Sequence, residues 1–234
     1  MNILFQSHSN GFTGSDLSLR EIIFYCKAND YNVFLCIPYN VDKTYVESLG
    51  LKNNNILFMK PMIWHKIKSP NYFRKFLQIA YIIFKTKGGF FYTVPKLIYF
   101  LKVNKINVVH SNSFVLLEGA IASKILNIPH IQHIRELLNK ENSPFEFPFQ
   151  SKSKFFKKLM NSLHRKIIFN SSISYSSVKK LFPKEKSLII PNSFPDEFYK
   201  NSIERKTIRT VGMVANITSR SKNHIFFLKI AKLA

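Results

Sequence analysis

Acidic residues are scarce in this chain of 234 residues, which has 13 Asp and Glu against 35 Lys and Arg and a formal net charge of +22. This surplus favours an anionic partner, such as a phosphorylated small molecule, an anionic lipid surface or a nucleic acid. An AT-rich genome produces the same heavy use of Lys, Asn, Ile and Phe without selection for binding. Charge by itself therefore speaks to association and leaves the fold open.

Cysteine is also scarce, and signal-like segments and long apolar runs are missing. The two cysteines, Cys26 and Cys36, fall within predicted apolar elements, which argues against a disulfide framework and for a reducing cytosol. The N-terminus has no charged segment followed by a small-residue cleavage site, so no signal peptide is predicted. No apolar run approaches the ~20 residues that a membrane-spanning helix needs. A cytoplasmic location is therefore expected.

Several catalytic motifs are absent as well. The chain has no Walker loop, no G-x-S-x-G, no H-E-x-x-H and no Cys/His metal spacing, so ATPase, hydrolase and zinc-site interpretations lack support. The glycine-containing segment near the N-terminus is not G-x-G-x-x-G, which removes the dinucleotide fingerprint. We therefore expect neither a metal nor a cofactor.

The elements that are present begin with a strand, a polar loop, a helix and a second strand in residues 2–38. The helix at 15–30 places Leu19, Ile22 and Cys26 at helical spacing. The alternation continues with strands at 55–60, 106–110, 128–134, 166–170 and 187–191 and helices at 42–50, 115–126, 151–165 and 174–182. Such alternation is typical of parallel βαβ units, so we predict an α/β fold with a Rossmann-like, doubly wound parallel sheet.

Three segments are expected along the chain. Residues 1–190 form the N-terminal Rossmann-like domain, and residues 191–206, which are polar and without clear periodicity, form a linker. A new strand at 207–214 and a helix at 222–234 then indicate the first βα unit of a second domain. One βα unit cannot bury its own apolar face. Residues 207–234 therefore predict the start of a second domain that is cut short.

Residues 61–105 differ in character, because they contain many basic residues, no acidic residue and two aromatic-rich runs, at 76–84 and 90–100. One interpretation makes these runs helices that pack on the sheet and turn lysine-rich faces to solvent. In the other, part of the region is an interfacial surface, whose aromatic side chains enter the lipid headgroups while its basic residues contact lipid phosphate. The two interpretations are compatible, since one helix can pack with one face and present the other.

Polar and charged residues follow three of the predicted strands, in the segments 9–16, 110–113 and 133–136. In a doubly wound sheet, the loops after these strands can surround one crevice. The His, Arg, Glu and Asp side chains there would supply acid–base groups and contacts to an anion. For His110, His130 and His133 taken singly, a partly buried strand histidine that is satisfied by the backbone is an open alternative.

Four motifs carry a resemblance to a known family. Residues 13–21, TGSDLSLRE, are similar to the G-G-A-E-R-S-L-x-E signature of family 4 (group 1) glycosyltransferases, and residues 107–112, NVVHSN, to their D-V-V-H-x-H strand end. Residues 174–177 followed by 188–192, LIIPN, resemble their S-x-x … V-I-P-N-G stretch. Residues 211–218 with Lys222 resemble the V-G-R-L-x-x-x-K-G element that opens their second domain. The four motifs occur in the family's order over nearly the whole chain.

This resemblance implies the GT-B fold, in which two Rossmann-like domains face each other across a cleft, with the acceptor on the N-terminal domain and the nucleotide-sugar on the C-terminal domain. It implies sugar transfer from a nucleotide-sugar to a hydroxyl without a bound metal, while positive side chains and helix amides stabilise the leaving diphosphate. The nucleotide-sugar is a substrate, so no cofactor is implied. The expected role is bacterial surface-polysaccharide biosynthesis, of lipopolysaccharide or capsule, with a lipid-linked saccharide acceptor at the inner face of the plasma membrane.

The resemblance also assigns roles by matching motif positions. The expected catalytic residues, where the family keeps a cleft histidine or an R-D/R-E pair, are His133, Arg135 and Glu136. The expected acceptor-binding residues are Gly14, Asp16, His110 and Asn112. The expected donor-binding residues, which include a basic residue for the donor diphosphate, are Asn192, Asn216, Arg220 and Lys222.

Several positions depart from the family pattern. Thr13 stands where the first glycine usually is, Ser193 replaces the glycine after Asn192, and Asn216 occupies the place of an arginine. The donor domain, with its E-x7-E segment, is missing after Ala234. We therefore expect the chain to bind nucleotide-sugar poorly by itself. It would be a fragment, a disrupted reading frame, or half of a split enzyme that pairs with a separate donor-domain chain.

The alternative function is non-enzymatic, a stand-alone domain that binds an anionic glycolipid or an anionic membrane. A nucleic-acid-binding protein, whose affinity would fall steeply with salt, is a weaker match, because the aromatic residues fit a core better than a basic strand face. No nucleic-acid partner is therefore expected.

Overall fold

A computed structural model describes residues 1–61, 66–67, 91–137, 145–146, 154–192, 212–213 and 223–233 of the chain. The chain divides into two compact units, Met1–Phe194 and Pro195–Ala234. The first unit contains the sheet and most of the described residues. In the second, the described secondary structure is the helix α8 (His224–Leu233). The candidate site is therefore built from the first unit alone.

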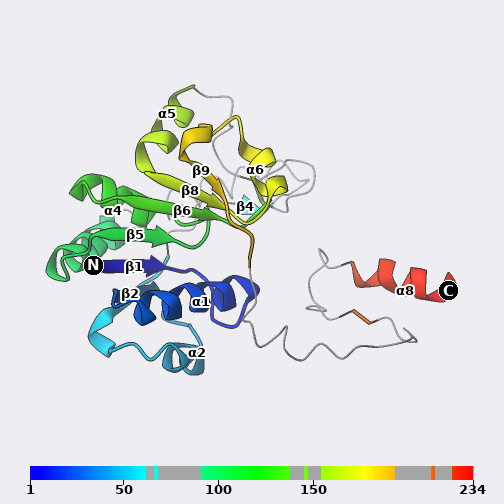
Figure 1. Ribbon diagram of the computed structural model, residues 1–234, viewed down its shortest axis with the longest axis horizontal. Helices are drawn as coiled ribbons and strands as arrows, with labels where there is room; N and C mark the ends of the chain where they lie inside the picture. The colour runs from blue at the N-terminus through cyan, green and yellow to red at the C-terminus, as the bar shows by residue number, and fades with distance from the viewer. Residues whose placement is uncertain are drawn as a thin grey trace. The chain divides into compact units, whose positions relative to one another are not determined.

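The first unit is organised around a parallel sheet of seven strands in the order β3-β2-β1-β5-β6-β8-β9 (Figure 1). From β1 the chain winds outward to β2 and β3, then returns to the other side of β1 and continues from β5 to β9. This reversal defines a doubly wound sheet, and it confirms the predicted fold class. The strands are β1 (Asn2–Gln6), β2 (Asn32–Ile37), β3 (Ile56–Phe58), β5 (Val108–Ser111), β6 (His130–Ile134), β8 (Lys166–Phe169) and β9 (Ser187–Ile189).

Helices connect these strands, because parallel pairing requires a crossover between neighbours. The helices before β5 are α1 (Gly14–Ala28), α2 (Lys43–Ser48) and one that covers the described residues 91–103. Those after β5 are α4 (Glu118–Leu126), α5 (Lys154–Leu163) and α6 (Ser172–Val178). The smaller elements are the 3-10 helices η1 (Asn53–Asn55) and η2 (Lys184–Lys186) and an antiparallel pair, β4 (Lys66–Ile67) and β7 (Phe145–Glu146).

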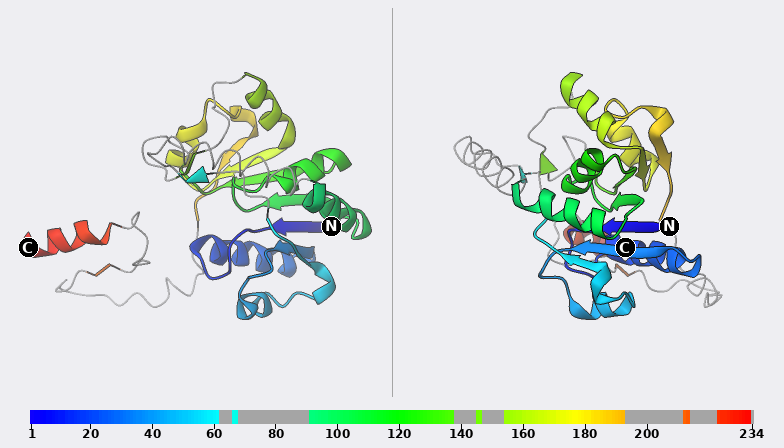
Figure 2. Two further views of the ribbon diagram at one scale, coloured as in Figure 1. Left: turned by 180° about the vertical axis from the view of Figure 1, so that it is seen from behind. Right: turned by 90° about the vertical axis from the view of Figure 1, so that its left-hand side faces the viewer.

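Hydrophobic cores form on both faces of the sheet, because successive side chains of a strand point to opposite faces. In β1, Ile3 packs with Leu19 of α1. The next residue, Leu4, packs in the opposite core, which contains Leu97 of the helix at 91–103. Figure 2 shows α1 and this helix on opposite sides of the strands. The sheet is therefore a buried middle layer, and its strand ends are the accessible part.

Two predicted helix boundaries move for identifiable reasons. The helix predicted at 115–126 starts at Glu118, because hydrogen bonds to Glu136 hold the residues before it in a turn. The helix predicted at 174–182 starts two residues earlier, because Ser171 caps its first turn through a capping box, and it ends at Val178. The other strands and helices predicted within 1–190 are present, with ends that differ by a few residues.

The basic region at 61–105 is described only in part, and its aromatic run at 76–84 lies outside the described residues. The helix at 91–103 buries Val94, Leu97 and Leu101 against the sheet. The packing interpretation is therefore confirmed for this helix. None of the helices that the structure describes is both long enough and apolar enough to cross a membrane. Cys26 and Cys36 are buried and unbonded, as expected.

The predicted linker and second domain are mostly outside the described part of the chain. Of the linker at 191–206, the first two residues are described, and of the strand predicted at 207–214, residues 212–213 are described and are irregular. The helix predicted at 222–234 is present as α8, which has no buried residue. The division into an acceptor domain, a linker and an incomplete donor domain stays a prediction.

Candidate functional site

The candidate site lies at the carboxyl ends of β1, β5, β6 and β9, beside the point where the winding direction reverses. β1 and β5 are neighbours, and loops that leave neighbouring strands in opposite directions open a crevice between them. Six of the eleven predicted site residues follow these four strands, and two more lie within β5 and β6. The six are Gly14, Asp16, Asn112, Arg135, Glu136 and Asn192, and the two are His110 and His133. They come from positions as far apart in sequence as Gly14 and Asn192, and the sheet brings them to one edge.

Asp16 organises the loop after β1. Its side chain is 1% exposed, and its carboxylate accepts hydrogen bonds from the Thr13 amide (3.0 Å), the Thr13 hydroxyl (2.6 Å) and the hydroxyls of Ser7 (3.2 Å) and Ser9. Thr13 in turn caps α1 in a capping box with Asp16. Thr13, which replaces the family's glycine, therefore acts as a helix cap. Asp16, expected to bind the acceptor, spends both carboxylate oxygens on its own loop.

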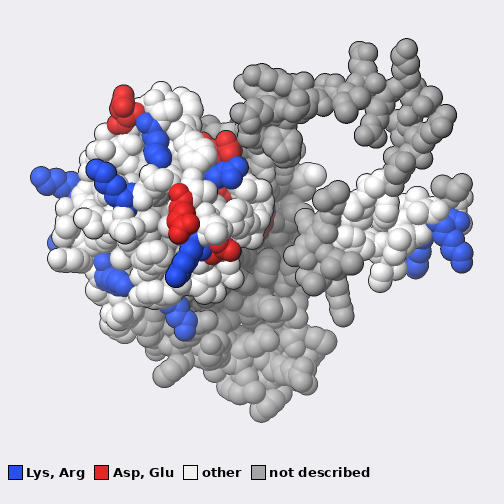
Figure 3. Space-filling view, turned by 90° about the horizontal axis from the view of Figure 1, so that it is seen from below, with Lys and Arg blue, Asp and Glu red and all other residues white. Residues whose placement is uncertain are grey.

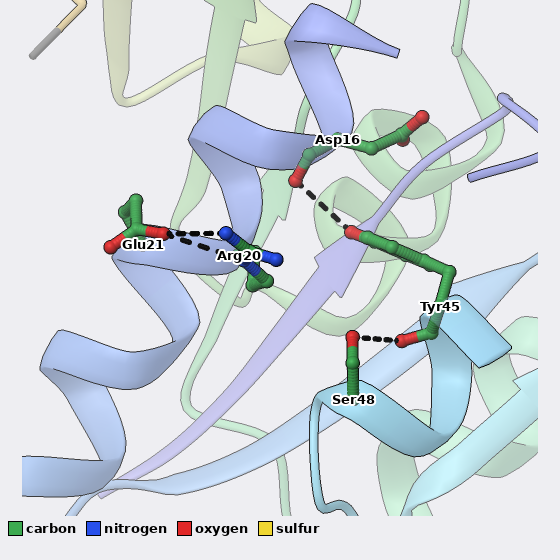
Figure 4. A network of polar contacts seen from close by, with 5 residues as sticks. All are labelled: Asp16, Arg20, Glu21, Tyr45 and Ser48. Atoms are coloured by element: carbon green, nitrogen blue, oxygen red, sulfur yellow. Dashed lines mark hydrogen bonds and ion pairs between the residues drawn. The ribbon is translucent and has the colours of Figure 1, made fainter. Parts of the chain in front are cut away.

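Tyr45, a buried residue of α2, also holds this loop in place. Its hydroxyl donates to the backbone carbonyl of Asp16 at 3.1 Å, and Ser48 donates to the Tyr45 carbonyl (Figure 4). Burial raises the pKa of the Tyr45 phenol well above its ordinary value, so the hydroxyl remains a donor. Gly11 has φ +95°, and a Cβ there would lie 2.9 Å from the Tyr45 Cβ. Glycine is therefore required at position 11 both by its dihedral angle and by the close approach of Tyr45.

Gly14 differs from Gly11 in both respects. It is the first residue of α1, its φ is not positive, and a Cβ added there would have no atom within 4 Å. Neither packing nor backbone conformation demands glycine at this position. The space beside it leaves the first turn of α1 accessible, and the amides of a helix N-terminus favour an anion.

Glu136 does for the loop after β5 what Asp16 does for the loop after β1. One carboxylate oxygen accepts from the Ser113 hydroxyl, and the other accepts from the amides of Phe114 (3.2 Å) and Arg135 (3.1 Å). The side chain therefore holds the turn that precedes α4. Glu136, expected to be catalytic, has its oxygens committed to positioning this turn.

Arg135 links three strand ends. Its Nε donates to Asn112 Oδ1 and its Nη1 to Asn192 Oδ1, both at 2.9 Å, and Asn112 Nδ2 donates to the Ser15 carbonyl at 3.1 Å. Its Nη2 is buried and has no hydrogen-bond partner in the described part of the chain. Burial lowers the pKa of the Arg135 guanidinium, while Glu136 and Asp16 raise it. The Nη2 group of a charged side chain is thus buried at this edge without a hydrogen-bond partner among the described residues.

His110 and His133 form a stacked pair beside Arg135. Their ring centroids are 5.6 Å apart with an interplanar angle of 23°, and both side chains are buried. Within the described residues, His110 Nε2 and both ring nitrogens of His133 lack a hydrogen-bond partner. Burial, and secondarily Arg135, lowers the pKa of His110 to about 3 and that of His133 to about 2. Both rings are therefore neutral at pH 7, so each has one nitrogen that can accept a hydrogen bond and one that can donate, and both are weak bases.

His130 belongs to a different network. Its Nε2 is 2.9 Å from the Ser111 hydroxyl, and its Nδ1 is 2.9 Å from His164 Nδ1. Ser111 also donates to Gln6 Oε1 at 3.0 Å. The alternative of a buried histidine satisfied by its surroundings therefore holds for His130, although through side chains. It does not describe His110 and His133.

An open groove of about 600 Å³ borders the site along α1. His133 and Asn192 of the strand-end site are among its lining residues, and so is Ser18, whose hydroxyl donates to Asn192 Oδ1 at 3.4 Å. The residues that line it are Ser18, Glu21, Ile22, Phe24, Tyr25, Ala28, His133, Ile190, Pro191 and Asn192. The groove therefore connects His133 with the largely apolar residues of α1 and with Ile190 and Pro191.

The remaining predicted donor-binding residues, Asn216, Arg220 and Lys222, lie outside the described residues. Among the described residues, no group of three or more His, Cys, Asp and Glu side chains is placed to hold a metal ion. Two contributors escaped the sequence argument, Ser7 and Tyr45. Their spacing fits ordinary strand and helix positions, so only the folded chain reveals that they hold the loop around Asp16.

Comparison with known proteins identifies the fold. No protein-family model matches the chain, and neither does any curated protein. Among solved structures, it is similar to a glycosyltransferase from Rickettsia africae ESF-5, with 16% identity and a TM-score of 0.54 over 87% of this chain and 46% of that one. It is similar to the UDP-GlcNAc 2-epimerase from Methanocaldococcus jannaschii, with 16% identity and a TM-score of 0.51 over 82% of this chain and 46% of that one.

A third similar structure is the lipopolysaccharide outer core galactosyltransferase WaaB in its apo form, with 14% identity and a TM-score of 0.52 over 83% of this chain and 46% of that one. The chain spans about half the length of the structures that it matches. At such low identity the likeness shows the fold alone, and that fold is one Rossmann-like half of the GT-B fold. Membership in family 4 and the roles of the site residues stay predictions.

Proposed function

We propose that this chain supplies the acceptor side of a GT-B glycosyltransferase. The enzyme would transfer a sugar from a nucleotide-sugar to a lipid-linked saccharide in bacterial surface-polysaccharide biosynthesis, at the inner face of the plasma membrane. One observation carries the proposal: a guanidinium with an unpartnered donor and two neutral imidazoles with unpartnered nitrogens gather at the carboxyl edge of the sheet, among the described residues. Their chemistry suits a hydroxyl nucleophile and an anionic leaving group.

The proposed role of each residue follows from the hydrogen bonds that it makes in the structure. In the proposed reaction the acceptor oxygen bonds to the anomeric carbon, the bond from that carbon to the donor phosphate breaks, and the hydroxyl proton passes to the departing phosphate oxygen. His133, whose pKa of about 2 makes it a weak base, accepts a hydrogen bond from the acceptor hydroxyl and orients it. Arg135 stabilises the departing diphosphate through charge and its remaining donor. Asp16 and Glu136, whose oxygens are engaged, position the two loops. Gly14, His110 and Asn112 complete the acceptor side.

The donor side is proposed from the sequence resemblance. Asn192 is tied to Arg135 at the edge of the first unit, and Asn216, Arg220 and Lys222 would contact the donor diphosphate from the start of a donor domain. The matched structures are about twice as long as this chain. A donor domain, in a longer chain or in a separate partner chain, would therefore complete the active site.

A transfer assay on the chain extended by a donor domain tests the proposal. Arg135→Ala is expected to lower kcat/KM by roughly 100-fold or more, the usual cost of removing one donor aimed at developing charge. Arg165→Ala is the matched control, because Arg165 is exposed at the opposite end of the sheet, before β8; it should retain full activity. If the extended chain neither binds UDP-sugars nor transfers sugar, the proposal is wrong, and the non-catalytic glycolipid-binding alternative gains support.

A further inference from the structure

The helix at residues 91–103 carries an exposed stripe on the side turned away from the sheet. Tyr92, Lys96, Tyr99 and Val103 recur at spacings of four, three and four residues, which place them on one helix face. Tyr92 is 63% exposed and Tyr99 is 72% exposed. The opposite side of the helix already packs on the sheet. The stripe therefore lies outside the hydrophobic core, and its aromatic rings are exposed for contact with a partner.

Tyr39 extends the stripe across the end of β2. Lys96 Nζ donates to the Tyr39 hydroxyl at 3.0 Å and to the Phe58 carbonyl at 2.9 Å, and it lies 5.4 Å from the centre of the Tyr39 ring. Tyr39 is also exposed. Because Tyr39 follows β2 and Phe58 ends β3, these contacts lie at the carboxyl edge that also bears the candidate site. The aromatic–basic surface is defined as Tyr39, Tyr92, Lys96, Tyr99, Lys102 and Val103.

The stretch of sequence that contains this helix has charges of a single sign. Residues 48–117 contain no Asp or Glu, while Lys96, Lys102 and Lys105 lie in or directly after the helix. The face seen from below in Figure 1, where α1 and α2 lie, is different, since acidic and basic side chains are interspersed on it (Figure 3). An exposed aromatic surface with positive charge and no acidic residue complements a surface that is both anionic and partly apolar.

We propose that the aromatic–basic surface binds the headgroup layer of an anionic membrane. Tyrosine suits this layer because its ring is apolar and its hydroxyl stays hydrated. Lysines near the surface meet lipid phosphate, and their long aliphatic stems can lie along the acyl boundary. A free phosphate would need several donors that converge on one point, whereas Lys96 is already engaged with Tyr39 and Phe58.

This inference deepens the proposed function and rests on it for its biological meaning, because the surface borders the edge where a lipid-linked acceptor would be used. The experiment that tests it measures membrane binding alone and requires neither a donor domain nor a nucleotide-sugar. A failure of sugar transfer and a failure of membrane binding are therefore separate results.

The experiment is flotation of the full chain with vesicles of phosphatidylcholine that contain phosphatidylglycerol, compared with vesicles of pure phosphatidylcholine. The double variant Tyr92→Ser/Tyr99→Ser and the variant Lys102→Gln are compared with Tyr25→Ser. Tyr25 is the matched control, since it is 67% exposed on α1, on the opposite side of the sheet and in a region with acidic residues. Thermal melting of each variant checks that these exposed substitutions leave the fold intact.

We expect wild-type chain to bind the anionic vesicles and to lose that binding at high salt. The tyrosine double variant should bind at least tenfold more weakly, Lys102→Gln about fivefold more weakly, and Tyr25→Ser like wild type. The inference is overturned if wild type does not bind the anionic vesicles or if Tyr25→Ser weakens binding as much as the double variant does. It is also overturned if inorganic phosphate displaces the chain from the vesicles at an ionic strength far below the one at which sodium chloride does, because that result would indicate a phosphate site.

Discussion

The two carboxylate-centred loops and the histidine pair lie at the same edge of the sheet, yet they treat their polar atoms in opposite ways. In the loops, Asp16 and Glu136 collect hydroxyl and amide donors until their oxygens are engaged. In the pair, His110 and His133 keep ring nitrogens without partners among the described residues. The difference teaches that the acidic residues build the frame, and the neutral and basic residues are left for a ligand.

Acidification should act on the histidines before it acts on the frame, and it is the largest expected effect. The pKa values of His110, His133 and His164 are lowered to about 3, about 2 and about 3, chiefly by burial, and that of His130 is also lowered. In the unfolded chain these histidines have pKa values near 6.5, so below about pH 6.5 they bind protons that the same histidines in the folded chain do not bind. Stability is therefore present above about pH 6.5 and is lost as the pH falls.

Between about pH 7 and about pH 5.5, each of these histidines should remove about 1 kcal/mol, or roughly 4 kcal/mol together. Urea unfolding at several pH values measures this loss, and His133→Phe should flatten the dependence by about 1 kcal/mol. A loss of stability confined to the range below about pH 4.5, where carboxyl groups ordinarily titrate, would contradict the assignment to histidines.

The next largest expected effect is the loss of stability when one of the two loop-holding carboxylates, Asp16 or Glu136, is removed. Asp16→Ala should destabilise the first unit by about 3 kcal/mol, because it removes the Asp16 half of the capping box and leaves the Thr13 amide and the Ser7 hydroxyl without their acceptor. Glu136→Ala should cost about 2 kcal/mol, since Glu136 is less buried. Chemical denaturation measures both, and the isosteric Asp16→Asn, which keeps an acceptor oxygen, should cost about 1 kcal/mol.

The assignment of Asp16 to a structural role would be wrong if Asp16→Ala unfolds at the wild-type temperature and yet no longer binds ligand. That outcome would make Asp16 a direct ligand contact and would return it to the role that the sequence resemblance assigned.

The smallest expected effect is at Gly14, the first residue of α1, and it contrasts with the effect at Gly11 in the loop before it. Gly11→Ala should cost about 2 kcal/mol, because position 11 has φ +95° and an added Cβ would lie 2.9 Å from Tyr45 Cβ. Gly14→Ala should change stability by less than about 0.5 kcal/mol, since nothing lies within 4 Å. The urea midpoints of the two variants provide the measurement; equal midpoints would contradict the proposed difference.

Much of the first unit could be predicted from local patterns. Apolar runs at strand length and helical spacing in residues 15–30 identify the alternation, and the alternation identifies parallel βαβ units. Thr13 and Asp16 are three residues apart at the start of a helix, where a capping pair is common, yet the resemblance directed Asp16 to the acceptor. The local rule described the hydrogen bonds of this residue better than the motif did.

Other features could not be predicted because they depend on contacts between distant segments. Nothing local indicates that the Tyr45 hydroxyl reaches the carbonyl of Asp16, or that Arg135 donates to Asn192. The same holds for the histidines, since His110, His130 and His133 all lie in short apolar strands. Only the packing of the sheet assigns His130 to an internal network and leaves the other two unpartnered.

The amino-acid sequence by itself determined the α/β class, the winding of the sheet and which strand ends would carry polar residues, because strand and helix periodicity are properties of neighbouring residues. The tertiary structure decided which of those polar groups are consumed by the frame and which remain for a ligand. That choice depends on hydrogen-bond geometry between segments as far apart as Ser15, Asn112 and Asn192, and buried polar atoms find their partners only when the sheet has brought those segments together.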